Sequence, residues 1–307
     1  MRWRTVVSLD DKTFASLTEI RVRAPHEVAG ALATRRRRAT LTQDGMLFIV
    51  AADHTARAMV GLYDDPLAMA DRRSMLDRLL IALDHQRVDG VLGSAEIIDD
   101  LALLGAIHDK VAVGTMNRGG LAGASWTLDD RFTAYDTAHL QAANLDAGKL
   151  LLRIDYSDAG TIPTLAAAAH AVQELNDAQM MAMVEPIPYS KNDKGEAVWD
   201  TDPLALVKAV GVSAALGGSS AYTWLKIQAT ADIATVAKVT TQPLLLLGGA
   251  PGPDPEATFA LWEDALHQPT VRGLVIGRSL LYPASGDVEV TVSRAADLVH
   301  QAAKDRQ

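Results

Sequence analysis

Short apolar segments of strand length recur along the whole chain, and longer Ala- and Leu-rich segments with helical spacing separate them. The eight strand-like segments are residues 46–52, 88–92, 110–114, 149–155, 180–186, 222–227, 243–248 and 272–276. Near-continuous apolar strands that alternate with helices are typical of a parallel sheet covered on both faces. Eight such units close a barrel. We therefore predict an α/β fold, a single (β/α)8 TIM barrel, with a doubly wound open sheet as the alternative.

Proline and glycine mark the expected helix ends. Pro66, Pro203 and Pro255 each follow an aspartate, and each suits the first position of a helix. Gly217 and Gly218 follow the last apolar turn of another helix, where a glycine stop is expected. The proline and glycine positions between the strands therefore agree with the helices that a barrel requires.

The domain prediction is an N-terminal helical extension over residues 1–45, followed by the barrel over residues 46–307. One amphipathic helix in the extension is expected to lie across the bottom of the barrel as a plug. Two connections, 115–132 and 187–200, are long and follow strand ends. Because the loops after barrel strands build the active face, these two are where substrate selection is expected.

Composition narrows the possible partners. The chain has 29 basic and 38 acidic residues, a net charge of -9, so a nucleic-acid or anionic-membrane partner would need a strong basic patch. The one basic run is 35–38, which we interpret as a solvated helix end rather than a binding patch. We expect no nucleic acid and no membrane as partner.

Cysteine, histidine and apolar runs carry further expectations. The chain has no cysteine, which excludes disulfides and thiolate sites and fits the reducing cytoplasm. Its eight histidines are scattered without a close pair at metal-ligand spacing. No apolar run approaches the ~20 residues that span a bilayer. We expect a cytoplasmic protein that needs no metal and no cofactor.

Charged residues inside apolar strands suggest a reactive site. Lys226 is flanked by apolar residues near the end of its strand, where a buried ammonium is costly unless it is paired or neutralised. A lysine that reaches the surface or forms a structural ion pair is one interpretation. The other is an amine with a depressed pKa that attacks a carbonyl and forms an imine.

Period-two spacing puts Lys149, Leu151, Arg153 and Asp155 on one face of the 149–155 strand. If that face is inward, the two cations would lower the pKa of Lys226 and Asp155 would balance their charge. Alternatively, Lys149 begins the strand at the lower end of the barrel.

Two carboxylates complete the candidate catalytic set. Glu185 ends an otherwise apolar strand and suits a general acid or base, which imine chemistry requires. Asp53 ends the first strand at the same height, with a structural salt bridge or helix cap as the alternative.

The last two strands end in glycine-rich turns, Gly248 with Gly249 and Gly277 with Arg278. Barrel enzymes commonly hold phosphate at these positions through backbone N–H groups. Arg278 can add a bidentate contact, so we predict a site for phosphate or a similar anion such as sulfonate.

Together these residues resemble the class I aldolase superfamily of tagatose 1,6-bisphosphate, sulfofructose phosphate, archaeal-type fructose bisphosphate and deoxyribose-phosphate aldolases. The resemblance covers roughly residues 46–285. It implies a Schiff-base lysine at Lys226, and it rests also on matches at Lys149, Asp155, Glu185, Asp53, Gly277 and Arg278. Segment 243–248 lacks the additional lysine of deoxyribose-phosphate aldolases, which argues against that substrate. A further resemblance, to actinobacterial barrel proteins associated with inositol catabolism, suggests 2-deoxy-5-keto-gluconate 6-phosphate.

The expected function is therefore reversible aldol cleavage of a phosphorylated ketose or keto-sugar acid by a lyase. Lys226 would form the Schiff base and Glu185 would move protons, while Asp53 and Lys149 would orient substrate hydroxyls. A phosphosugar isomerase or epimerase that uses the two carboxylates is one alternative. A non-catalytic phosphosugar-binding protein is the other. We also expect a homo-oligomer.

Overall fold

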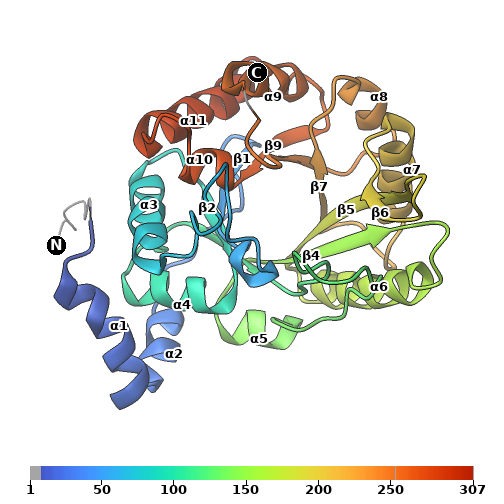
Figure 1. The fold of residues 1–307 in the computed structure, drawn as a ribbon. Coiled ribbons are helices and arrows are strands. Elements are labelled where there is room, and N and C mark those ends of the chain that lie inside the picture. Colours follow the sequence, from blue (N-terminus) through green and yellow to red (C-terminus); the bar gives the residue numbers. More distant parts are fainter. Residues whose placement is uncertain (1–7, 253, 307) are drawn as a thin grey trace.

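Eight parallel strands form a closed barrel in the computed structural model, which describes residues 8–252 and 254–306 (Figure 1). They are β1 (Leu47–Ala51), β2 (Gly90–Gly93), β3 (Val111–Thr115), β4 (Ala147–Ile154), β5 (Met181–Lys191), β7 (Thr223–Gln228), β8 (Leu244–Leu247) and β9 (Val271–Ile276). Their order is β4-β3-β2-β1-β9-β8-β7-β5, and the pairing of β4 with β5 closes the ring. This confirms the TIM barrel. The short β6 (Ala197–Trp199) pairs antiparallel with the end of β5 as a hairpin that we did not expect.

Helices surround the barrel (Figure 1). They are α3 (Arg72–Asp84), α4 (Ala95–Leu103), α5 (Thr137–Ala142), α6 (Thr161–Asp177), α7 (Pro203–Ala214), α8 (Ile233–Ala237), α9 (Pro255–Leu266), α10 (Arg278–Leu281) and α11 (Val288–Lys304). Pro203 and Pro255 begin helices as expected, each behind an aspartate that caps the helix. The expectation for Pro66 was wrong, because Asp71 caps α3 and that helix begins at Arg72.

The N-terminal extension contains two helices, α1 (Asp11–Arg23) and α2 (His26–Ala33), instead of one. Figure 1 shows both outside the ring, with α2 beside α4, so neither plugs the barrel. The part of the extension that packs against the barrel interior is Leu41, in the segment that leads into β1. An irregular segment therefore covers the bottom of the barrel.

The arginine run 35–38 is not a solvated helix end. Arg35 is buried and pairs with Asp146, to which Arg37 also donates at 2.7 Å. Arg38 pairs with the buried Asp89 at 2.7 Å. Asp89 and Asp146 directly precede β2 and β4, and their buried carboxylates need cationic partners, which these guanidinium groups provide. The run fixes the extension under the barrel.

Apolar side chains fill the lower part of the barrel interior. The inward-facing set is Leu47, Ile49, Ala51, Leu92, Val111, Val113, Ala147, Met181, Met183, Leu245 and Val275. Because strand side chains alternate, the next inward positions toward the carboxyl ends are Asp53, Lys149, Glu185 and Lys226. The packed floor thus places ionisable groups at the mouth, where barrel enzymes react. Among the described residues, no helix is long and apolar enough to cross a membrane.

Candidate active site

Four ionisable side chains from four strands meet at the mouth of the barrel. Lys149 Nζ lies 2.6 Å from Glu185 Oε2 and 3.2 Å from Asp53 Oδ2. Lys226 Nζ lies 3.1 Å from Glu185 Oε1. All four residues are buried, and Lys226 is 5% exposed. The structure therefore brings together these four sequence-predicted residues and places Lys226 inside the barrel.

The two lysines differ in their electrostatic environment. Burial lowers the pKa of Lys226, Glu185 opposes that shift, and the positive charge of Lys149 adds to it, so the pKa falls below its ordinary value. Burial acts on Lys149 too, but Asp53 and Glu185 both contact it and raise its pKa. Lys149 therefore keeps its proton, and Lys226 is the amine that loses its proton more easily.

Both carboxylates remain ionised in this cluster. Burial would raise the pKa of Glu185, but Lys149 and Lys226 outweigh it and lower the value to about 2. The same two lysines hold the pKa of Asp53 below its usual range despite burial. Two negative groups thus balance the two lysines, and Glu185 is in direct contact with Lys226.

Arg153 and Asp155 do not join the cluster, contrary to our expectation. Arg153 forms a buried ion pair with Asp130 at 2.6 Å and stacks on Trp126 at 4.9 Å. Asp155 accepts hydrogen bonds from the backbone and hydroxyl of Ser157 at the start of the next loop. The alternation of side chains along β4 was predicted correctly, but the carboxylate of Asp130, in the loop after β3, pairs with the Arg153 guanidinium.

Arg153 instead anchors the long loop after β3. The Trp126 ring, which it contacts, also packs against Tyr189 with ring centroids 4.7 Å apart. Trp126 Nε1 donates to Asp158 at 3.0 Å. These contacts hold the two long loops together beside the barrel mouth, which gives Trp126 and Tyr189 a structural role.

The glycine turns after β8 and β9 lie side by side. A Cβ on Gly248 would meet Ile276 at 2.7 Å and Ser279 Oγ at 3.3 Å. A Cβ on Gly277 would lie 2.4 Å from both the Ala51 carbonyl oxygen and a His54 ring carbon, so only glycine fits there. Gly249 has φ +64° and open space beside it. The backbone can therefore approach a ligand closely at this edge of the mouth.

Two polar groups at these turns have no partner among the described residues. Arg278 Nε and Ser279 Oγ are buried without a hydrogen bond. Buried donors are normally satisfied, so a ligand that accepts a hydrogen bond from either group would remove a free-energy cost. Anion binding at these turns stays a prediction, and these two groups are its candidate donors.

Arg57 was missed by sequence reasoning. It belongs to the short 3₁₀ turn η1 (Thr55–Arg57) that follows β1, and its Nη2 approaches the Gly120 carbonyl oxygen at 3.4 Å. Its Nε is buried without a partner among the residues described. Nothing in the local sequence distinguishes it from other loop arginines.

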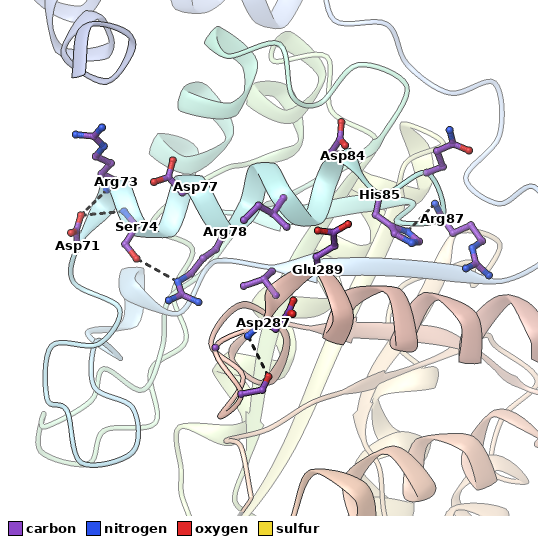
Figure 2. Close-up of a pocket in the computed structure, with 15 residues that line it drawn as sticks. Asp71, Arg73, Ser74, Asp77, Arg78, Asp84, His85, Arg87, Asp287 and Glu289 are labelled. Carbon is purple, nitrogen blue, oxygen red and sulfur yellow. Dashed lines mark hydrogen bonds between the residues drawn. The ribbon is translucent and has the colours of Figure 1, made fainter. Parts of the chain in front are cut away.

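A groove of about 1120 Å³ lies elsewhere, between α3 and the start of α11 (Figure 2). Its arginines are already engaged: Arg73 pairs with Asp11, and Arg78 donates to the Leu281 carbonyl. It contains no lysine, so it is not a Schiff-base site. Across the described ranges, no group of three or more His, Asp or Glu side chains has an arrangement that could hold a metal ion.

A model of the Cgl0159-like family matches residues 45–296. The crystal structure of Cgl0159 from Corynebacterium glutamicum is 48% identical, with a TM-score of 0.91 over 95% of this chain and 98% of that chain. An archaeal fructose 1,6-bisphosphate aldolase superposes with a TM-score of 0.64 at 18% identity, over 89% of this chain and 99% of its own. The fructose-bisphosphate aldolase from Slackia heliotrinireducens also reaches 0.64, at 14% identity over 100% and 95% of the two chains. No curated protein matches the chain.

The aldolase structures show a shared barrel fold and nothing more, because their sequence identities to this chain are low. The family model, by contrast, spans most of the sequence, and the Corynebacterium protein aligns over nearly its full length. This chain belongs to the Cgl0159-like family.

Proposed function

We propose that this protein is a class I aldolase that forms a Schiff base through Lys226. The observation that carries the proposal is the buried Lys226 amine, 3.1 Å from Glu185 and with a lowered pKa, beside a second lysine that keeps its charge. A neutral amine is the form that attacks a carbonyl carbon. A barrel of the same fold supports the proposal: one archaeal aldolase structure has its catalytic lysine covalently bound to the carbinolamine intermediate.

The reaction begins with proton transfer from Lys226 to Glu185. The neutral Nζ adds to the substrate carbonyl carbon, and the carbonyl oxygen takes up two protons and leaves as water. One ammonium and one ketone thus give one iminium and one water, with no net proton consumed. Glu185, within reach of Lys226, relays the protons to the departing oxygen.

Cleavage then uses the iminium as the electron sink. Glu185 takes the proton from the hydroxyl next to the breaking bond, the C–C bond electrons move toward the iminium, and an aldehyde leaves. The enamine is protonated on carbon, and water hydrolyses the new iminium to release the second product. Lys149 and Asp53, which contact each other at 3.2 Å, orient the substrate hydroxyls.

The proposed substrate is a phosphorylated ketose or keto-sugar acid, with 2-deoxy-5-keto-gluconate 6-phosphate as one candidate. Its anionic group would bind the turns at Gly248, Gly249, Gly277 and Arg278. The test is release of glycerone phosphate or another aldol product from a panel of phosphorylated ketoses and keto acids. Replacement of Lys226 by Met should abolish release, whereas retained turnover would favour an isomerase that needs only Asp53 and Glu185.

A further inference from the structure

The reactive cluster is nearly closed to solvent. The side chains of Lys149, Lys226 and Glu185 are 2%, 7% and 8% exposed, and that of Asp53 is 7% exposed. A sugar-sized ligand must contact several of these groups at once, and a binding pocket buries most of the surface of such a ligand. Access to the cluster therefore depends on whether a segment above it can move.

The loop after β3 crosses above the cluster and contacts three other segments. Its Ala122 N donates to the carbonyl oxygen of Arg57 at 2.9 Å. The centre of its Trp126 ring lies 4.9 Å from the Arg153 guanidinium and 4.7 Å from the centre of the Tyr189 ring. These three partners follow cluster residues by four positions each, namely Asp53, Lys149 and Glu185. Because a strand rises about 3.3 Å per residue, β4 and β5 carry the loop roughly 13 Å beyond the cluster.

Both ends of this loop are fixed. Asn117 and Asp130 are buried, and the Asn117 amide donates to the carbonyl oxygens of Asp130 at 3.0 Å and Leu151 at 2.8 Å. Asp130 also pairs with Arg153 at 2.6 Å. These anchors leave residues 120–125 as the part of the loop that can move, and we call this segment the flap.

The flap is lightly attached. It reads Gly-Leu-Ala-Gly-Ala-Ser, and every residue of it after Gly120 is exposed. Gly120 and Gly123 have φ values of +67° and +78°, which glycine adopts without strain. Two hydrogen bonds join the flap to other segments of the described chain, and both involve Arg57: Ala122 N donates to its carbonyl at 2.9 Å, and its Nη2 donates to the Gly120 carbonyl at 3.4 Å. The second contact is long, so one backbone hydrogen bond is the main latch.

We propose that the flap is a gate, which admits a ligand to Lys226 when its hydrogen bonds to Arg57 break and covers the mouth when they re-form. The net contribution of one hydrogen bond corresponds to about a two- to tenfold change in an equilibrium constant, so the latch favours the closed form and still permits opening. The inference rests on the proposed function in that it assigns an access route to the same amine. It requires no imine.

Acylation by a succinimidyl ester tests the gate without any ketone, because the reagent needs only access to a neutral amine. After brief labelling at one pH, digestion and mass spectrometry compare Lys226 with Lys208, an exposed lysine of α7. Ala122→Pro removes the N–H group of the latch and should raise the rate of Lys226 labelling about two- to tenfold. Ala122→Ser keeps that N–H group and is the matched control, so its Lys226 should react at the wild-type rate.

A reversible lock tests the opposite direction. The chain has no cysteine, so Ala58→Cys combined with Ala122→Cys introduces a single pair of thiols beside the contact between Arg57 and the flap. When this pair is oxidised, or joined by a short thiol crosslinker, labelling of Lys226 should fall and labelling of Lys208 should stay the same. Reduction of the disulfide should restore the rate at Lys226.

Equal labelling of Lys226 in locked and unlocked protein would overturn the gate. An unchanged rate in Ala122→Pro, with a thermal melt like that of the wild type, would do so too. Absence of labelling at Lys226 in every form would also overturn it, since an opening flap must expose the amine. None of these results involves capture of a ketone, so failure of the gate and failure of the Schiff base are distinguishable.

Discussion

Lys149 and Lys226 lie on opposite sides of one carboxylate, and their pKa values shift in opposite directions. The difference arises because Lys149 pairs with Asp53 as well as Glu185, whereas Glu185 is the one carboxylate among the described residues that pairs with Lys226. Lys149 thereby holds its proton more firmly than an ordinary lysine, and Lys226 holds its proton less firmly, as the proposed nucleophile must.

The lysines should differ in their contribution to stability. Lys149→Met leaves two buried carboxylates short of a cation and should lower the free energy of unfolding by about 3–5 kcal/mol. Lys226→Met removes a charge that burial already disfavours, and Glu185 keeps its contact with Lys149, so its cost should stay below about 1.5 kcal/mol. Urea unfolding of both variants measures this, and equal costs would contradict the assignment.

The pH dependence of carbonyl capture should report the lowered pKa of Lys226. Capture needs the neutral amine, so its rate should rise with pH and level off below 10.5, the ordinary pKa of lysine. Lys149→Met removes a neighbouring cation, raises the pKa of Lys226 and should move the plateau to higher pH. Rates of borohydride-dependent inactivation across pH give the profile. An unmoved plateau in Lys149→Met would argue against electrostatic coupling of the lysines.

Gly277→Ala should damage anion binding more than imine formation. The added Cβ would collide with the Ala51 carbonyl and the His54 ring, both at 2.4 Å, and would shift the turn that carries Arg278. We expect KM for a phosphorylated substrate to rise about tenfold or more, because charged hydrogen bonds are lost. Capture of an unphosphorylated ketone should change little. Steady-state kinetics on both substrates separates these effects, and a similar loss on both would indicate general distortion.

Arg153→Met should loosen the loop after β3 without affecting Lys226. The substitution leaves the buried Asp130 without its cation and removes the guanidinium that stacks on Trp126, whose ring keeps its contact with Tyr189. Limited proteolysis should then cut within residues 117–131, and capture of a small ketone should persist. If the variant no longer captures the ketone although its loop resists proteolysis, Arg153 contacts the substrate after all.

The fold was predictable because strand and helix periods alternate eight times, and the lysines and Glu185 were predictable because charge inside an apolar strand is rare. Side-chain alternation placed Arg153 on the same face as Lys149, but sequence could not show that Asp130, from a distant loop, would neutralise it. Arg57 was missed for the same reason, since its position depends on how two loops meet. The run 35–38 resembles a helix end in sequence, but Arg35 and Arg38 are drawn beneath the barrel by ion pairs with Asp146 and Asp89, which lie far away in the sequence.

The proposed chemistry requires Lys226 to capture a ketone. Protein incubated with glycerone phosphate and borohydride, then digested and analysed by mass spectrometry, should carry one reduced adduct on the peptide containing Lys226. The adduct should be absent in Lys226→Met and present in the control variant Arg118→Gln, which changes an exposed arginine of the loop after β3. An adduct on Lys149, or none on any lysine, would exclude Lys226 as the Schiff-base residue.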